Sequence, residues 1–556
     1  MYLGVNLLHD TSAAILCDGV LIAAVEQERF DGCRHSTNFP HEAIAYCLHE
    51  VGAKIEDIKG VGITFDYSSF IMNGRPFEQN TVRHDDITHA GRQIQNARNL
   101  ETYRNAMQSM RDSGLSQFIS ICHHLCHAAG TFFSSGFKSS NILVVDGRGE
   151  DESTSLYLGD DMTITKLYNY DVKNSLGHLY TYVTSLCGLY SHIGQEGKTM
   201  GLASYGTGKI SIIDSVLKFN SNSYFVDREA MRALKDIADK GIFSENSKEL
   251  AYAVQKALER AFVFLADDLH KRTGNPNFCF AGGVTLNCNA NGKVSELDFV
   301  KKLYIQPGAN DAGAAVGAAM ILHIGDVGTR PVVKEQVYLG PSFKPQDVET
   351  YLVQESIAFT KVNNPELEAA KLINNGKIIG WCQGAMEFGP RALGNRSILA
   401  APTSASIRDK VNVIKQRESW RPLAPSVLAE QSSTWFTSDT ESPFMLLTMT
   451  VRPEFRARVP AITHVDGTAR VQTVTESFNK PYYSLIKEYF KLSGVPMVLN
   501  TSLNTKGKPI VSSIKDCIEC LYESGLDAIF IGNVLIRNAL LSKETVDLRE
   551  EMEALS

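Results

Sequence analysis

Hydrophobic and polar residues alternate in blocks along the first part of the chain. Apolar runs at 2–8, 13–17 and 20–30 are separated by short polar turns. Runs of this length bounded by turn residues predict β-strands, and short connections between them predict antiparallel pairing. The same order recurs at 141–168, where the run NILVV is followed by two predicted strands that meet at a Gly-Asp-Asp turn. We therefore expect an α/β domain with a duplicated core.

Each of the two units places an aspartate directly after its first predicted strand. Asp10 follows the run at 2–8, and Asp146 follows the run at 141–145. Two such units indicate a duplicated ribonuclease-H-like core, in which the carboxyl ends of the strands face a shared ligand site. The alternative for either residue is a turn aspartate that bonds its own backbone.

Two later segments carry small residues where close contacts are expected. The run at 277–281 leads into Gly282 and Gly283, where the missing side chains would let the backbone approach a ligand, as in an adenosine-binding turn. The run at 303–305 leads to Asp311 and to a predicted helix with a flat face of glycine and alanine. Asp311 either faces the same ligand site or caps this helix.

A pair of histidines offers metal ligands. His123 and His127 in HHLCHAAG are four residues apart, so a helix would place both imidazoles on one face. The alternative is a pair of surface or hydrogen-bonded core histidines. His124 stands where a zinc-peptidase helix has its glutamate base, so the pair lacks a built-in hydrolytic base. Together with Asp146 and Asp311, the histidines form a nitrogen and oxygen set that suits iron, manganese or zinc better than calcium.

Length and composition restrict the classes of function. The 556 residues are enough for two or three domains, and the formal net charge of −7, with both signs interleaved, argues against a nucleic-acid partner. The eleven cysteines are scattered, and the CxxC pair Cys517 and Cys520 falls in a predicted helix, so we expect reduced thiols. The chain starts without a leader pattern and lacks an apolar stretch of about 18 residues, so we expect a cytoplasmic protein with no membrane partner.

The carboxyl-terminal part, expected from 331 after a Gly/Pro connector at 328–331, gathers basic residues in a few motifs. This density of guanidinium and ammonium groups suits phosphate and carboxylate groups, and the alternative is a solvated face. Apolar and proline residues at 420–425 favour a partly buried wall. The candidate anion ligands are Arg391, Arg396, Lys415, Arg417, Arg421 and Arg470, with Asn500 and Ser502 at the end of a predicted strand.

Motifs along the whole chain occur in the order of one enzyme family. They are LLHDTSAAI, HHLCHAAG, LVVDGRGE, EGKTMGLASYG, CFAGGVTLNCNANGK, GANDAGAAVGAA, MEFGPRALGNRSILA, DGTARVQTV and VLNTSLNTKGKPIV. In this order, from about Tyr2 to Ile536, they resemble the NodU and tobramycin-type O-carbamoyltransferases. The resemblance implies an actin-like (ASKHA) domain at 1–330, similar to the threonylcarbamoyl transferases that modify tRNA, and a YrdC-like α/β domain at 331–556. It also implies metal binding by His123, His127, Asp146 and Asp311.

The resemblance further implies a reaction in two steps. The YrdC-like domain would convert carbamoyl phosphate and ATP, with its magnesium ion, to carbamoyl-adenylate and pyrophosphate. The actin-like domain would transfer the carbamoyl group to a hydroxyl of a small-molecule natural product, an antibiotic or other secondary metabolite. A transition metal, with iron as the first candidate and manganese or zinc as others, would polarise the carbonyl.

Roles for individual residues follow from the same resemblance. His9 would be the base for the acceptor hydroxyl, beside Asp10, because imidazole titrates near neutrality; its alternative is a turn residue. Catalysis of adenylate formation falls to Arg391, Lys415 and Arg421. The nucleotide in the actin-like domain would be held by Gly282, Gly283, Asn287 and Lys198.

Two other classes of function remain open from the sequence. A tRNA threonylcarbamoyl transferase would share the metal site but needs a basic RNA-binding face, and a nonenzymatic actin-like nucleotide switch would have no use for the histidine pair. The polar segment at 68–116 is our candidate for acceptor-specific structure. The acceptor itself and a homodimeric state stay open.

Overall fold

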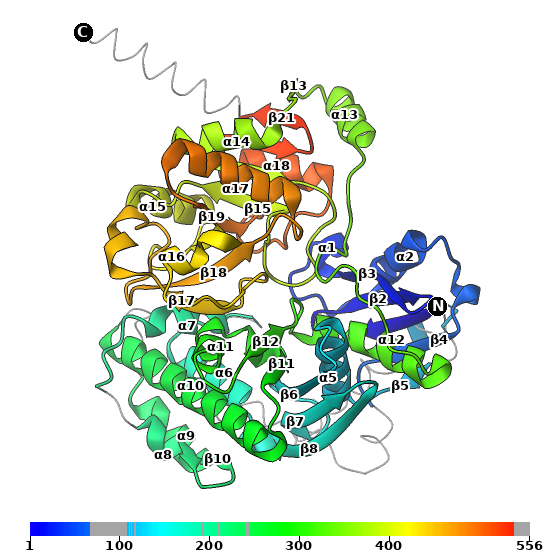
Figure 1. Ribbon diagram of the computed structural model, residues 1–556, viewed down its shortest axis with the longest axis vertical. Helices are drawn as coiled ribbons and strands as arrows, with labels where there is room; N and C mark the ends of the chain where they lie inside the picture. The colour runs from blue at the N-terminus through cyan, green and yellow to red at the C-terminus, as the bar shows by residue number, and fades with distance from the viewer. Residues whose placement is uncertain are drawn as a thin grey trace. The chain divides into compact units, whose positions relative to one another are not determined.

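The computed structural model describes residues 1–66, 118–190, 194–209, 212–238 and 244–538, with a few positions between 108 and 115. The chain forms two compact units (Figure 1). The first comprises Met1–Asp31 and His35–Leu339, and the second comprises Gly32–Arg34 and Gly340–Ser556. The proposed acceptor segment at 68–116 lies almost entirely outside the described residues.

The first sheet of unit 1 has the strand order β3-β2-β1-β4-β5. β1 pairs with β2 and β2 with β3 in antiparallel fashion, whereas β1, β4 and β5 run parallel. The strands are β1 (Tyr2–Asn6), β2 (Ser12–Cys17), β3 (Val20–Glu26), β4 (Gly60–Ile63) and β5 (Ile119–Ser120). The predicted run at 20–30 is a strand only to Glu26, because the short helix α1 (Glu28–Asp31) follows it.

The second sheet of unit 1 repeats this topology. Its order is β8-β7-β6-β11-β12, with β6, β7 and β8 antiparallel and with β6, β11 and β12 parallel. The strands are β6 (Ser139–Val145), β7 (Glu152–Asp160), β8 (Thr163–Asp171), β11 (Asn277–Ala281) and β12 (Lys302–Ile305). Equal order and equal strand directions confirm the predicted duplicated α/β core.

One helix follows the last strand of each sheet, and these two helices pack together. α5 (His123–Ser134) follows β5, and α12 (Asp311–Val327) follows β12. A Cβ on Gly317 of α12 would lie 1.8 Å from the carbonyl oxygen of Cys126 in α5, and a Cβ on Gly4 of β1 would lie 1.8 Å from that of Ala315. The predicted face of small residues is therefore the packing face of α12.

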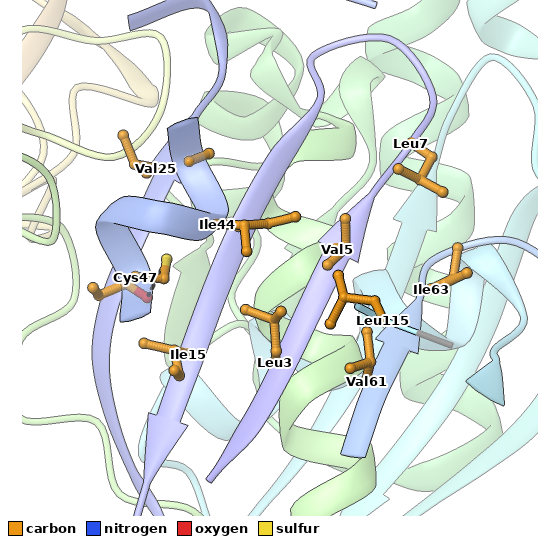
Figure 2. Close-up of a cluster of buried hydrophobic side chains, with 13 residues drawn as sticks. Leu3, Val5, Leu7, Ile15, Val25, Ile44, Cys47, Val61, Ile63 and Leu115 are labelled. Carbon is orange, nitrogen blue, oxygen red and sulfur yellow. Dashed lines mark hydrogen bonds between the residues drawn. The ribbon is translucent and has the colours of Figure 1, made fainter. Parts of the chain in front are cut away.

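Apolar side chains fill the space between the first sheet and α2 (His41–Glu50). Leu3 and Val5 of β1 and Ile15 of β2 lie beside Ile44 of the helix, and all four are at most 5 % exposed (Figure 2). Alternate residues of the strands supply this layer, because successive side chains of a strand point to opposite faces. The core holds β1 in place, and the loop after β1 carries His9 and Asp10.

The remaining elements of unit 1 lie mainly between β8 and β12 in the chain, and the long helix α10 dominates them (Figure 1). They are α6 (Leu176–Leu186), α7 (Glu196–Ala203), α8 (Ile213–Val216), β9 (Leu217–Phe219), β10 (Tyr224–Val226), α9 (Arg228–Ala233), α10 (Glu245–Thr273) and α11 (Cys288–Ser295). Among the described helices, none is long and apolar enough to cross a membrane.

Unit 2 is built on a nine-stranded sheet of order β13-β21-β20-β14-β15-β19-β16-β18-β17. The strands are β13 (Thr360–Lys361), β14 (Ile379–Cys382), β15 (Arg396–Ala400), β16 (Ala424–Leu428), β17 (Leu447–Thr450), β18 (Thr468–Val474), β19 (Met497–Ser502), β20 (Ala528–Ile531) and β21 (Val534–Arg537). The helices are α13 (Pro345–Gln354), α14 (Pro365–Asn374), α15 (Ala405–Ile414), α16 (Ser432–Trp435), α17 (Lys480–Ser493) and α18 (Ile514–Ser524). The CxxC pair lies in α18, in agreement with the helix predicted for it.

Candidate functional site

Four buried side chains of unit 1 converge on one point. The Nε2 atoms of His123 and His127 are 3.2 Å apart, and His123 Nε2 lies 3.2 Å from a carboxylate oxygen of Asp146 and 3.6 Å from one of Asp311. All four ligand atoms lie within 4.8 Å of one another. The duplication explains the convergence, because the two histidines lie in the first turns of the helix after β5, Asp311 begins the equivalent helix after β12, and Asp146 directly follows β6.

Hydrogen bonds around the cluster orient its ligands. His123 Nδ1 donates to the carbonyl of Thr64 at 3.0 Å, so Nε2 is the ring nitrogen that faces the two carboxylates. The amide of Gly283 donates to the other oxygen of Asp146 at 3.1 Å. Asp311 is not the N-cap of α12, because Asn310 holds that position, so its carboxylate is available to the cluster.

Opposite charges stabilise the ionised forms of this cluster. Burial alone would lower the pKa of His123, but the carboxylates of Asp311 and Asp146 raise it well above its usual value. Burial would likewise raise the pKa of Asp311, but His9 and His123 hold it well below its usual value. Two imidazole nitrogens and two carboxylate oxygens in a buried space suit a divalent transition metal, and one oxygen of Asp311 has no hydrogen-bond partner among the described residues. The group can hold a metal ion.

His9 and Asp10 adjoin the metal-ligand cluster from the loop after β1. His9 Nδ1 bonds a carboxylate oxygen of Asp10 at 3.0 Å, and His9 Nε2 lies 3.4 Å from a carboxylate oxygen of Asp311. Burial would lower the pKa of His9, but Asp311, Asp10 and Asp146 together raise it to about 10. Asp10 has its carboxylate between two imidazoles, those of His9 and His35, so it is not a turn aspartate bonding its own backbone.

Several of the predicted cations of unit 2 lie together near one end of its central strands. In the register of the strands, Ser397 pairs with Ser502 and Ala424 pairs with Asn500, so the start of β15, the end of β19 and the start of β16 lie together. Lys415, which caps α15, donates to the carbonyls of Ser502 at 2.6 Å and of Asn504 at 2.7 Å. Its ammonium group is therefore held at the end of β19.

Like charges crowd at this end of the strands. Burial, followed by the charges of Arg417, Arg34 and Arg421, holds the pKa of Lys415 well below its usual value. Burial, with Arg421 and Arg470, lowers the pKa of Arg417 to about 9. One terminal nitrogen of Arg417 is buried without a hydrogen-bond partner in the described part of the chain. Cations that destabilise one another in this way form a site that an anion would stabilise.

Comparison of the sequence with known protein families identifies the family of this chain. The family model for the carbamoyltransferase N-terminus matches residues 1–320, and the model for the carbamoyltransferase C-terminus matches residues 370–538. The chain belongs to the carbamoyltransferase family. This membership confirms the resemblance read from the motifs, and it favours carbamoyl transfer over tRNA modification and over a nonenzymatic switch.

Similar full-length chains occur in several organisms. The carbamoyltransferase is 35% identical to the nodulation protein NolNO of Sinorhizobium fredii over 97% of this chain and 80% of that one. It is 33% identical to an uncharacterized protein of Synechocystis over 96% of each chain. It is 27% identical to nodulation protein U of Rhizobium tropici over 91% of each chain.

The four residues predicted to hold a nucleotide in this carbamoyltransferase have varied surroundings. Gly282 has a φ of 90°, and a Cβ there would lie 2.3 Å from the carbonyl oxygen of Val145, so its glycine is required by close packing against β6. Gly283 positions Asp146, as described above. Asn287 caps α11 by accepting from the amide of Ala290 at 3.0 Å, which favours a structural role. Lys198 lies half-buried on α7.

Arg396 and Asn500 differ from the other predicted anion ligands. The guanidinium of Arg396 is fully buried and donates to the carbonyls of Gln383 at 2.7 Å and Pro341 at 2.9 Å, which favours a structural role over ligand binding. The amide of Asn500 is also fully buried and donates to the carbonyl of Ala392 at 3.0 Å. Both side chains shape the loop between β14 and β15, which carries the half-buried Arg391.

Sequence reasoning missed three contributors to these sites. Arg34 belongs to unit 2, although it lies early in the chain, and its charge lowers the pKa of Lys415. Glu387 accepts the amides of Leu393 and Asn395, each at 2.8 Å, and so anchors the loop of Arg391. His35 bonds Asp10 at 2.7 Å. The adjacent pair Arg34-His35 in a polar turn was the available signal for two of them.

Proposed function

We propose that this chain is an ATP-dependent O-carbamoyltransferase that acts through carbamoyl-adenylate. The crowded cations of unit 2 carry this proposal. Burial and neighbouring cations, Arg470 among them, lower the pKa of Lys415, Arg417 and Arg421, and such a group favours a ligand with several negative charges. Carbamoyl phosphate and the ATP triphosphate have such charges. Family membership supports the carbamoyl donor.

Adenylate formation is assigned to unit 2. Water hydrolyses carbamoyl phosphate to carbamate and inorganic phosphate, and a carbamate oxygen then attacks the α-phosphorus of ATP, so that carbamoyl-adenylate forms and pyrophosphate leaves. Arg391, Lys415 and Arg421 hold the phosphoryl oxygens, and the magnesium ion of ATP helps them to balance the negative charge. Arg417, Arg470 and Ser502 complete the anion site. In this kind of reaction positioning and electrostatic stabilisation supply most of the catalysis.

Carbamoyl transfer is assigned to unit 1. His123, His127, Asp146 and Asp311 would hold a divalent transition metal, with iron first and manganese or zinc as alternatives, and the ion would supply Lewis-acid polarisation of the carbamoyl carbonyl. Asp311 and Asp146 would no longer raise the pKa of His9 once their charges are neutralised as metal ligands. Neutral His9 then takes the proton from the acceptor hydroxyl, while Asp10 holds its ring through Nδ1. The hydroxyl oxygen then bonds to the carbamoyl carbon, and AMP leaves.

The acceptor is proposed to be a hydroxyl group of a small-molecule natural product, an antibiotic or other secondary metabolite. Incubation of the enzyme, ATP and carbamoyl phosphate with a panel of hydroxylated metabolites should give one product that has gained a single carbamoyl group by mass spectrometry.

Pyrophosphate release tests the proposal before an acceptor is known. The purified protein with ATP, magnesium and carbamoyl phosphate should release pyrophosphate, and Arg421→Ala should lose this activity at least 100-fold, since a charged hydrogen bond to the ligand disappears. Arg408→Ala is the matched control, because Arg408 lies on the nearby α15 and pairs with Asp409 rather than with the cation cluster. A wild-type reaction that releases no pyrophosphate would contradict the proposal.

A further inference from the structure

His35 lies behind the proposed base in a chain of hydrogen bonds. Its Nδ1 is 2.7 Å from one carboxylate oxygen of Asp10, and the other oxygen of Asp10 is 3.0 Å from Nδ1 of His9. An ionised carboxylate only accepts, so both imidazoles donate to it from Nδ1. The order of groups is therefore His35, Asp10, His9 and then the metal-ligand carboxylate of Asp311, which faces His9 Nε2 at 3.4 Å.

The backbone is strained at both residues that form the first of these bonds. Asp10 and His35 each have a φ of 55°, in the left-handed region that residues with a Cβ seldom adopt. Strain of this kind persists only where surrounding contacts enforce it, and it gathers at functional sites. The two positive φ values therefore mark the Asp10 to His35 contact as a candidate functional feature.

Neighbouring groups enforce this conformation from both sides. The amide of His35 donates to the carboxylate of Glu28 at 2.7 Å, and the amide of Thr11 donates to the carbonyl of Ser36 at 3.1 Å. A Cβ on Gly194 would lie only 2.2 Å from His35 Nε2. The imidazole of His35 is thus wedged between Asp10 and the backbone of Gly194, which has no side chain to displace it.

We propose that His35 is a positioning residue for carbamoyl transfer: it donates to Asp10 and so fixes the carboxylate that orients His9. The bond from His35 to one oxygen of Asp10 restrains rotation of the carboxylate, so the other oxygen stays in place to accept from His9 Nδ1, and Nε2 of His9 is left for the acceptor hydroxyl. In a catalytic triad a carboxylate orients the histidine base, and here a second imidazole in turn holds that carboxylate. The proposal rests on the proposed function of His9.

A pair of isosteric variants separates hydrogen bonding from shape. In His35→Asn, the amide nitrogen takes roughly the place of Nδ1 and donates to Asp10, whereas His35→Asp has the same size but presents an oxygen to that carboxylate. Asparagine and aspartate both tolerate the left-handed backbone, so the two variants carry similar strain. His35→Gly adopts the conformation freely, lacks the donor and leaves room for added imidazole.

Two steps are measured on each protein, which carries its metal, with ATP and carbamoyl phosphate as substrates and water as the probe acceptor. Pyrophosphate release reports adenylate formation, and AMP release reports carbamoyl transfer. We expect all three variants to form pyrophosphate at the wild-type rate with unchanged KM values, which also shows that they are folded. His35→Asn should keep AMP release within about threefold, while His35→Asp and His35→Gly lose it roughly 10- to 100-fold and imidazole restores it in His35→Gly.

Equal AMP release in His35→Asn and His35→Asp, whether retained or lost, would overturn the role of the hydrogen bond, and so would wild-type AMP release in His35→Gly. If His35→Asp is too unstable to purify, His35→Gly with and without imidazole decides between these outcomes. Wild-type protein that releases no pyrophosphate would overturn the proposed function and this role together, so the two failures are distinguishable.

Discussion

Two buried glutamates hold loops by accepting backbone N–H groups. Glu387 does so for the loop that carries Arg391. Glu249 of α10 accepts the amides of Thr207 and Lys209, each at 2.7 Å, in the glycine-containing loop after α7. Buried polar backbone groups need partners, and a carboxylate satisfies several of them at once.

The hydrogen bonds that Glu249 accepts give a pH-dependent contribution to stability. Burial would raise the pKa of Glu249, but the amides and hydroxyl that it accepts lower it overall. A depressed folded-state pKa means that the contribution is complete above the unfolded value of about 4.3 and is lost as the pH falls through the folded value. We expect Glu249→Gln to reduce the free energy of unfolding at pH 7 by about 1–3 kcal/mol, because one donating amide replaces an acceptor.

Denaturant unfolding at pH 7 and at steps below pH 4.5 measures this effect. The difference between Glu249→Gln and the wild type should shrink as the pH falls. Glu245→Gln is the matched control, because Glu245 lies on the same helix and is exposed to solvent, where its pair with Lys209 contributes little. A difference in the free energy of unfolding that grows as the pH falls would contradict this role of Glu249.

At the scale of elements, the helices α5 and α12 bring the metal ligands together. Each helix follows the last strand of its own sheet, and the duplicated topology makes the two helix starts equivalent positions. Contact between the helix backbones needs small residues, as at Gly317 against Cys126. The distance between His123 and Asp311 therefore depends on the packing of these helices and not only on the loops before them.

Two glycines of α12 provide a matched test of this packing. Gly317→Ala should lower the free energy of unfolding by about 1–3 kcal/mol or more, because its Cβ would overlap the carbonyl of Cys126. Gly325→Ala, on the same helix, meets no atom within 4 Å and should raise stability by about 0.4–1 kcal/mol. Thermal unfolding of both variants checks the contrast, and equal effects would argue against close helix packing.

At the scale of the whole molecule, the sequence predicted what local patterns encode. Apolar runs bounded by turn residues predicted most strands of the two sheets in unit 1, although not β4 and β5, and the His-x-x-x-His spacing selected His123 and His127. Tertiary context decided the rest. Arg396 turns inward to backbone carbonyls, and Asn287 caps a helix, although both stand in motifs rich in ligand-like residues. Arg34 joins unit 2 from the other end of the chain. Contacts between residues that are far apart in the sequence leave no periodic pattern in it.

In the proposed function, each of the two units carries out one step of the reaction. If unit 2 makes carbamoyl-adenylate and unit 1 transfers the carbamoyl group, loss of a metal ligand should stop only the second step. His123→Ala removes one ligand from the buried cluster, and His124→Ala is the control on the same helix, because His124 bonds Ser155 at 2.7 Å and is not one of the four ligands.

The decisive measurement is pyrophosphate release and carbamoylated product in the same reaction, with ATP, carbamoyl phosphate and an acceptor from the metabolite panel. We predict that His123→Ala loses bound metal and carbamoylated product but releases pyrophosphate within a few-fold of the wild-type rate, while His124→Ala keeps its metal and both steps. Equal loss of pyrophosphate and product in a folded His123→Ala enzyme would contradict the assignment of the two steps to separate sites.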